Sequence, residues 1–76
     1  MKNTKWRCVG DCCKRYRIKK GWTLEFVAEK AGFSRQYMSM FESGFSNSMK
    51  CLCVYIKLGI DIDELIHAYE ADMRRW

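Results

Sequence analysis

The most constraining feature of the sequence is a pair of short apolar-periodic segments separated by only two residues. The first covers residues 23–31, the second covers residues 34–43, and Gly32 lies between them. Within each segment, apolar residues recur three or four positions apart, which is the spacing of one face of an α-helix. Thr23 and Ser34 are N-cap residue types, and a glycine readily adopts the left-handed conformation that ends a helix. The sequence therefore predicts two short helices joined by a tight turn.

Three further helices are predicted around this unit. Apolar residues on one face predict a helix from Cys8 to Lys19. Residues 49–58 are apolar at nearly every position, and their length and the neighbouring helices favour a helix over a strand. A cap-like pair, Asp61 and Glu64, opens a last, long helix with an apolar stripe at helical spacing, made of Ile62, Leu65, Ile66, Tyr69, Met73 and Trp76. The expected fold is an all-α, five-helix, single domain over residues 1–76.

The last two helices carry more apolar surface than one small domain can cover. A helix that is apolar all round must be buried on more than one side. We expect the first half of the last stripe to pack in the core, and the part beyond Tyr69 to remain uncovered. Ile56, Met73 and Trp76 are therefore the candidates for an interface with a second copy of the chain.

The charges of the chain are unevenly distributed. The sequence has 14 Lys and Arg against nine Asp and Glu, a formal net charge of +5. The charged residues among the first 20 are mostly Lys and Arg, whereas those of residues 61–76 are mostly Asp and Glu. A basic end is where a polyanion would bind, although charge alone leaves open that these groups merely solvate the surface. No signal peptide or membrane-length apolar run is visible, so we expect a cytoplasmic chain with no membrane contact.

The composition gives no support for an enzyme or a metal site. The five cysteines lack the C-x-x-C spacing of zinc ligands, and His67 is the only histidine. We expect the cysteines to fill helix positions as small hydrophobic residues. No carboxylate pair and no nucleophile with a neighbouring base stands out. We therefore expect no catalytic activity, no cofactor, no metal and no small-molecule ligand.

Residues 21–44 read GWTLEFVAEKAGFSRQYMSMFESG. They closely resemble the Cro and phage-repressor-like helix-turn-helix family (lambda repressor-like, XRE type), whose members commonly read G-L-[ST]-x-E-x-[LV]-A-x-x-[AS]-G-[VF]-S-R-x-Y-[IL]-S-x-[IFL]-E-x-G. The resemblance extends over roughly residues 9–66. It implies a lambda repressor-like DNA-binding domain, with the helix-turn-helix unit at about 23–43. The family is frequent in phages and mobile elements.

The recognition helix of such a unit is expected at residues 34–43. The helical period places Arg35, Gln36, Ser39 and Met40 on its outward side, and recognition helices contact base edges with their N-terminal residues. Arg pairs with guanine and Gln with adenine through two hydrogen bonds each, and a methionine suits the thymine methyl group. The resemblance places the family's base-reading positions at Arg35, Gln36 and Met40.

Other residues are expected to contact the DNA backbone, which takes half or more of protein–DNA hydrogen bonds. The candidates are Thr23, Ser34, Tyr37, Lys14, Arg15, Lys19 and Lys20. Thr23 and Ser34 are also N-caps, and Tyr37 has the alternative of packing its ring against the first helix. The resemblance implies that Arg17 pairs with Glu42 and so has a structural role.

These observations lead to one principal hypothesis and one alternative. The first is a small transcriptional regulator, Cro- or repressor-like, that binds double-stranded DNA as a homodimer. The alternative is a protein-interaction module on the same fold, antitoxin-like or anti-repressor-like, which the apolar surface of the last two helices favours. RNA binding has less support, because the chain lacks an exposed pattern of stacking aromatics.

Overall fold

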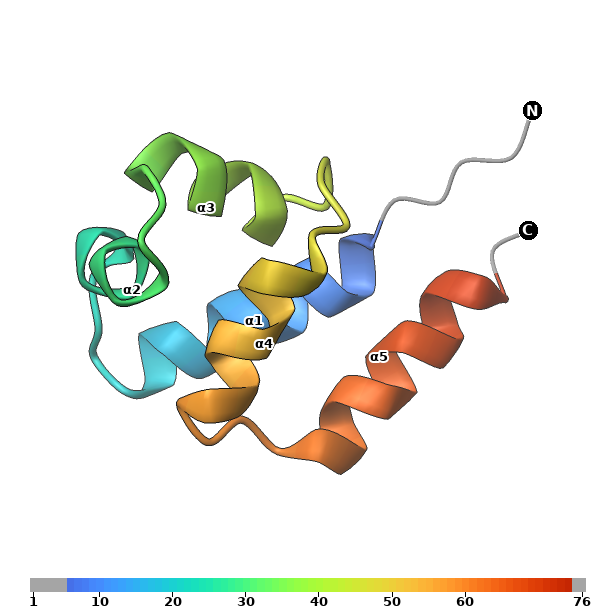
Figure 1. Cartoon of the computed structure of the whole chain (residues 1–76). Coiled ribbons are helices and arrows are strands. Elements are labelled where there is room, and N and C mark those ends of the chain that lie inside the picture. The colour runs from blue at the N-terminus through green and yellow to red at the C-terminus, as the bar shows by residue number, and fades with distance from the viewer. Residues whose placement is uncertain (1–5, 75–76) are drawn as a thin grey trace.

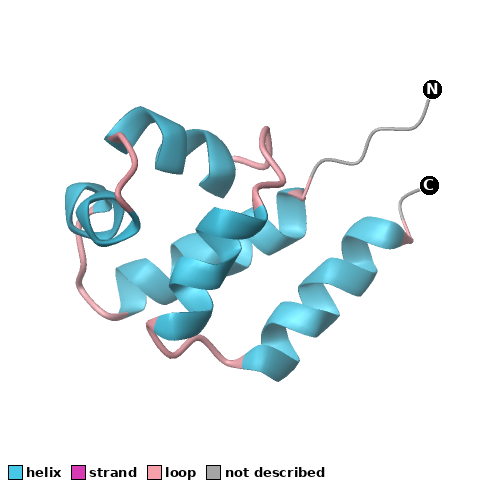
Figure 2. Ribbon diagram, in the orientation of Figure 1, coloured by secondary structure: helices cyan, strands magenta, loops and turns pink. Residues whose placement is uncertain are grey.

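The computed structural model describes residues 6–74. Over these residues the chain forms five helices and no strand, which confirms the all-α prediction (Figures 1 and 2). The helices are α1 (Arg7–Lys19), α2 (Leu24–Ala31), α3 (Arg35–Glu42), α4 (Met49–Lys57) and α5 (Ile62–Met73). In Figure 1, α1 runs behind α4, α2 and α3 lie at one end of the molecule, and α5 lies at the other.

N-cap side chains and glycines mark most of the helix ends. The side chains of Thr23, Ser34, Ser48 and Asp61 each accept a backbone N–H from the first turn of the helix that follows. These bonds satisfy amide groups that have no partner within the helix. Glycines with positive φ follow α1, α2, α3 and α4. The predicted helix positions are therefore confirmed to within about a residue for α1 to α4.

A single apolar core joins the helices. Its most deeply buried side chains are Val9 and Cys13 from α1, Val27 from α2, Met38 and Phe41 from α3, and Cys51 and Tyr55 from α4. These residues lie on the apolar faces that the helical spacing predicts. Because α1 to α4 all contribute to this core, the orientation of α3 is fixed by packing on three other helices.

The carboxylate of Asp72 links the end of α5 to the start of α1. α1 has no side-chain cap from its own N-cap residue, Trp6. Instead, Asp72 accepts the backbone N–H of Cys8 at 2.8 Å and that of Val9 at 3.0 Å. A negative charge at a helix N-terminus is favourable because amide groups and the helix dipole both point at it. This long-range cap holds α5 against α1.

The buried face of α5 differs from the one predicted. Leu65 and Asp72 are buried and Ala68 is partly buried, whereas Ile62 and Ile66 are 44% and 48% exposed. The prediction that the first half of the apolar stripe packs in the core is therefore wrong for these two isoleucines. The cause is the contact with α1, which the small Ala68 and the capping Asp72 make possible on the neighbouring face of the helix.

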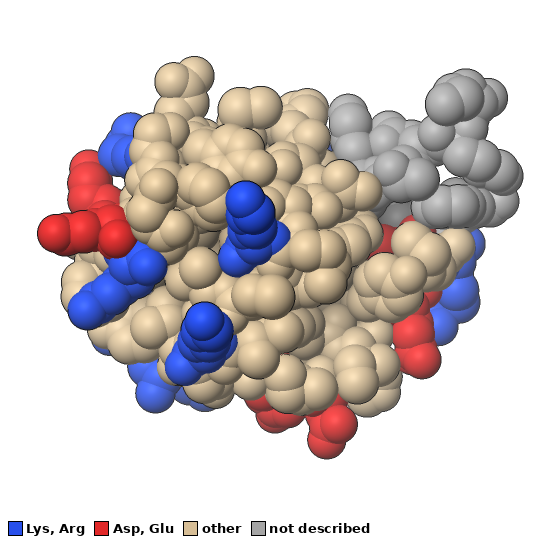
Figure 3. All heavy atoms as spheres, in the orientation of Figure 1, with Lys and Arg blue, Asp and Glu red and all other residues tan. Residues whose placement is uncertain are grey.

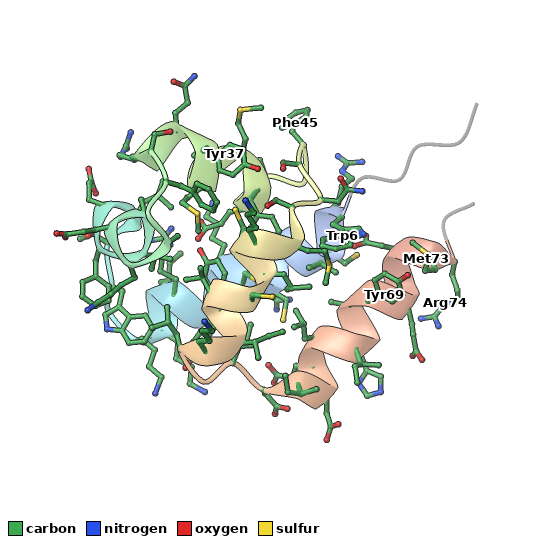
Figure 4. All side chains as sticks on the ribbon, in the orientation of Figure 1. Trp6, Tyr37, Phe45, Tyr69, Met73 and Arg74 are labelled. Carbon is green, nitrogen blue, oxygen red and sulfur yellow. The ribbon has the colours of Figure 1, made fainter. Side chains whose placement is uncertain are left out.

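The exposed face of α5 forms an apolar surface, which we call the α5 stripe. It consists of Ile62, Ile66, Tyr69 and Met73, at positions i, i+4, i+7 and i+11. Figure 4 shows Tyr69 and Met73 near Trp6, and the Trp6 and Tyr69 rings meet edge to face with centroids 6.1 Å apart. Of the predicted interface residues, Ile56 is exposed, Met73 is half-buried, and Trp76 lies outside the described residues.

Candidate nucleic-acid interface

Burial of one side of α3 determines which of its residues face solvent. Met38 and Phe41 are fully buried and Glu42 is almost so. The side of α3 opposite these buried residues faces solvent. Arg35, Gln36 and Met40 are exposed there, and Ser39 is half-buried. All four predicted base-contact residues therefore keep at least part of their surface accessible to a ligand.

Arg35 is engaged with a neighbour in the free protein. Its Nε lies 3.0 Å from Oε2 of Glu25, on α2, and both side chains are well exposed. Exposed ion pairs of this kind contribute about 0–1 kcal/mol. The pair therefore orients Arg35 toward α2 without preventing its transfer to a stronger acceptor.

The N-termini of α2 and α3 are both open to solvent. The Thr23 hydroxyl accepts the N–H of Phe26 at 3.0 Å, and the Ser34 hydroxyl accepts that of Tyr37 at 3.1 Å. Both hydroxyls thus serve as N-caps, and each still carries a hydrogen that it can donate. An exposed, capped helix N-terminus is a favourable place for a phosphate.

A buried hydrogen-bond network fixes α3 to α1 and α4. The Arg17 guanidinium donates to Glu42 through Nε at 2.8 Å and through Nη2 at 3.1 Å, and its Nη1 donates to the Trp22 carbonyl at 3.0 Å. The Tyr55 hydroxyl, from α4, donates to the same carboxylate. The hydrogen bond that Arg17 donates to Glu42 raises the pKa of Arg17. The pKa of Tyr55 is raised by burial and, to a smaller extent, by the hydrogen bond that Tyr55 itself donates to Glu42.

This network is structural, because both carboxylate oxygens face inward to partners. The Arg17–Glu42 contact is the one that the family resemblance implies. Tyr55 was missed by sequence reasoning, which treated it only as an apolar residue of α4. No local pattern links a tyrosine on one helix to a glutamate 13 residues earlier.

The ring of Tyr37 packs against the turn that precedes α3. Its centroid lies 4.7 Å from that of Phe33, and the side chain is half-buried. The ring contact that the structure shows is thus with the turn rather than with α1. A phosphate contact by the Tyr37 hydroxyl stays a prediction.

The four basic candidates, Lys14, Arg15 and Lys19 on α1 and Lys20 at its C-cap, do not share one face. Lys14 lies three positions from Arg17, so it projects from the side of α1 that faces α3. Arg15 and Lys19 lie two positions from Arg17 on either side, and two positions rotate a side chain by roughly 200°. Both line a groove between α1 and α5, where Arg15 also pairs with Asp11 at 2.9 Å. The structure therefore separates them from the α3 surface.

Lys20 is the C-cap residue that follows α1. Its ammonium group lies 5.6 Å from the centre of the Tyr16 ring, at the end of the helix that leads into α2. Of the four candidates, Lys14 thus lies on the side of α1 that faces α3, and Lys20 lies in the turn between α1 and α2.

Acidic groups are kept away from the middle of α3. In Figure 3 they gather at the outer edge of α2 and along α5, and the surface over the middle and C-terminal end of α3 shows none in this view. Residues 43–50 contain one lysine and no acid. This side of the molecule therefore presents little repulsion to a polyanion.

The cysteines are mainly packing residues. Cys12, Cys13 and Cys51 are buried, and the Cys51 sulfur lies 3.5 Å from that of Met38. Burial raises the pKa of Cys13 and of Cys51, so both thiols stay protonated and unreactive. Cys53 is exposed, which differs from the expected core position. Over residues 6–74, no three His, Cys, Asp or Glu side chains come together as they would around a metal ion.

No helix among residues 6–74 combines the length and the apolar character needed to cross a lipid bilayer.

A two-helix unit with a capped, outward-facing second helix defines the helix-turn-helix class of DNA-binding domains. The helix-turn-helix family model matches residues 14–48 of this chain, from the middle of α1 to the N-cap of α4. Over these residues the chain is similar to that family, in agreement with the resemblance to lambda repressor-like domains. Searches of curated proteins and of solved structures gave no significant match.

Proposed function

We propose that the protein is a small Cro- or repressor-like transcriptional regulator that binds specific double-stranded DNA sequences, with α3 in the major groove. The observation that carries this proposal is the outward face of α3, where Arg35, Gln36 and Met40 are exposed on a helix fixed by the core. A helix-turn-helix unit binds DNA in this way because its second helix fits the major groove. Such a regulator would act in the cytoplasm, where phage and bacterial DNA lies.

Each exposed side chain of α3 suits a particular base. Gln36 can pair with adenine through its amide, and Met40 can contact a thymine methyl group. Arg35 can pair with guanine once it leaves Glu25, at a cost of about 0–1 kcal/mol, whereas a bidentate base contact contributes about 1–3 kcal/mol. The exchange is therefore favourable. Ser39 is half-buried on the same side of α3 and is a weaker candidate for a base contact.

Backbone contacts would orient α3 in the groove. The Thr23 and Ser34 hydroxyls lie at exposed helix N-termini, and the Tyr37 hydroxyl, Lys14 and Lys20 flank the same unit. These groups carry no sequence information, but they set the register of the recognition helix. Arg15 and Lys19 are weaker candidates, because they line the groove between α1 and α5.

Selection of binding sites from randomised duplexes tests the proposal. The wild-type protein should enrich one short sequence, and Gln36→Ala should relax the preference at one position with an affinity loss of roughly 5- to 150-fold. The matched control is Lys20→Ala, which should weaken binding to all sequences alike and reduce the dependence on salt. Enrichment of no sequence at moderate salt would contradict the proposal, as would an identical preference of Gln36→Ala and wild type.

We further propose that the regulator is a two-fold homodimer. A single recognition helix reads few base pairs, and two half-sites about one helical turn apart give the selectivity that a genome requires. The α5 stripe offers four apolar side chains on one helix face, and Ile56 is exposed on α4. A symmetric interface can bring the same stripe of two copies together.

Ile66→Asp tests the dimer. Sedimentation equilibrium should show a dimer for the wild type and a monomer for Ile66→Asp, because a carboxylate cannot be buried unpaired in an apolar interface. Ile18→Asp, at a similarly exposed apolar site on α1, is the matched control and should stay dimeric. A wild-type chain that sediments as a monomer at high micromolar concentration would refute the dimer.

The α5 stripe also supports the alternative, a protein-interaction module that binds a different protein. Such a module would use the same stripe and would have no base preference. The two functions therefore differ in the duplex selection: the regulator enriches a sequence, and the module does not.

A further inference from the structure

The outward sides of α4 and α5 share one pattern of apolar and charged residues. On α4, three exposed apolar residues lie at positions i, i+4 and i+7, and two exposed lysines lie at i+1 and i+8. We call these residues the α4 face: Met49, Lys50, Cys53, Ile56 and Lys57. The α5 stripe opens with apolar residues at the same spacing, and two exposed acids, Asp63 and Glu70, take the positions of the lysines. The two helices thus present one pattern with opposite charge.

The charges flank the apolar residues on one side of each helix. Positions i+1 and i+8 lie about 80–100° around the helix from position i, and they are about 10.5 Å apart along its axis. When two such helices pack antiparallel with their apolar residues in contact, the charged flanks come to the same side. Lys50 then lies opposite Glu70, and Lys57 lies opposite Asp63. Both ion pairs can form at once because the two spacings are equal.

The positions of Lys50 and Glu70 are unfavourable within a single chain. Lys50 lies in the first turn of α4 and Glu70 in the last turn of α5, where each charge opposes the dipole of its own helix. In the part of the chain from residue 6 to residue 74, every ion pair joins other residues. An opposite charge on a second copy would stabilise both side chains.

We propose that the homodimer forms by two reciprocal contacts, in which the α5 stripe of each copy packs antiparallel on the α4 face of the other. This inference rests on the proposed dimer and names the surface that receives the α5 stripe. The occupant is a second copy of this chain, because the chain itself carries the pattern of opposite charge.

The arrangement of α4 and α5 within one copy suits both contacts. In Figure 1, α4 runs downward and α5 runs upward, and Figure 3 shows basic side chains over α4 and acidic side chains along α5. A two-fold axis that runs lengthwise between these helices places α5 of the second copy on α4 in the opposite direction, and symmetry repeats the contact. The same axis leaves both copies of α3 at one end of the dimer, as binding to two half-sites requires.

Charge disfavours the two other symmetric pairings. If α5 packed antiparallel on α5 of the second copy, Asp63 of each copy would face Glu70 of the other. If α4 packed in this way on α4, Lys50 would face Lys57. Like charges placed opposite each other are destabilising. Of the three pairings, α4 with α5 is the one that brings opposite charges together.

Charge reversal tests the pairing, with sedimentation equilibrium at low salt as the measurement. Lys50→Glu and Glu70→Lys each replace attraction by repulsion at both Lys50–Glu70 contacts of the dimer. The dissociation constant of the dimer should therefore rise by roughly 4- to 900-fold for either variant. Each substitution favours its own helix dipole, so thermal denaturation should show a folded chain. Glu29→Lys, at an exposed site on α2, changes the net charge as much as Glu70→Lys and should dimerise as the wild type.

Mixing the two variants gives the sharper result. In a heterodimer of Lys50→Glu with Glu70→Lys, opposite charges meet at both contacts. An equimolar mixture should therefore dimerise with about the wild-type dissociation constant, although each variant alone does not. A chain that carries both substitutions should form a homodimer again for the same reason.

Three results would overturn the inference while leaving the dimer intact. One is a wild-type dissociation constant for either single variant. Another is a tighter dimer for Glu70→Lys, which would show that the two α5 stripes face each other. The third is a mixture that dissociates as readily as the single variants, which would show that the two residues do not meet. A wild type that stays monomeric would instead contradict the proposed dimer, and DNA binding is tested separately by the duplex selection.

Discussion

Gly10 lies on α1 close to the backbone of α3, and replacing it with alanine tests that contact. A Cβ at this position would lie 2.5 Å from the Phe41 carbonyl oxygen and 2.7 Å from that of Glu42. Ordinary carbon–oxygen contacts begin at about 3.3 Å, so the two helices would have to separate by roughly 0.8 Å. The obstructing atoms belong to the backbone and cannot rotate away.

Two opposing effects set the size of the change. Alanine is a better helix former than glycine by about 1 kcal/mol. Overpacking against a fixed backbone costs about 1–3 kcal/mol, and the rigid neighbours favour the upper part of this range. Gly10→Ala should therefore lower the free energy of unfolding by roughly 1–2 kcal/mol, out of roughly 4–11 kcal/mol for a chain of this length.

Thermal denaturation followed by circular dichroism measures the effect. At about 4–8 °C per kcal/mol, the melting temperature should fall by roughly 4–16 °C. Amide chemical shifts should change most at Phe41 and Glu42, which face the new methyl group. A variant as stable as the wild type, or more stable, would refute the close contact, because helix propensity would then be the only effect left.

The remaining predictions concern the buried network and the thiols. Glu42→Ala leaves the Arg17 charge and the Tyr55 hydroxyl buried without their acceptor, so urea denaturation should show a loss of about 3–5 kcal/mol. A loss below 1 kcal/mol would show that the network is open to water. In native protein, a thiol reagent should modify the exposed Cys53 within minutes, whereas Cys13 should react only after unfolding. Equal labelling rates for both would contradict the core described above.

Much of the fold follows from local sequence signals. Thr23 and Ser34 cap the helices that the apolar spacing predicts, and the turn at Gly32 has the expected left-handed conformation. These features depend on residues within one or two turns of each other. A single sequence displays such local relations directly.

The missed features all depend on distant parts of the chain. Asp72 caps a helix that begins 65 residues earlier, and the approach to Gly10 is set by a backbone on another helix. On α5, Ile62 and Ile66 belong to the most apolar stripe, yet the helix buries the neighbouring face. Packing on α1 determines which face of α5 is buried, and the spacing of apolar residues within α5 does not reveal that packing.

The candidate site was predicted in its central part and less well at its edges. The exposure of Gln36 and Met40 follows from the helical period once Met38 faces inward. The engagement of Arg35 with Glu25 does not, because it depends on how α2 and α3 meet.

The DNA-binding surface can be located by titrating isotopically labelled protein with its selected duplex and following the amide and side-chain chemical shifts. If α3 enters the major groove, the largest changes should occur along its outward side, from Arg35 to Met40, and at the N-terminus of α2. Residues facing the groove between α1 and α5, such as His67, should change little. Large changes around His67 with none at Gln36 would contradict the account, because the DNA would then lie on the other side of α1.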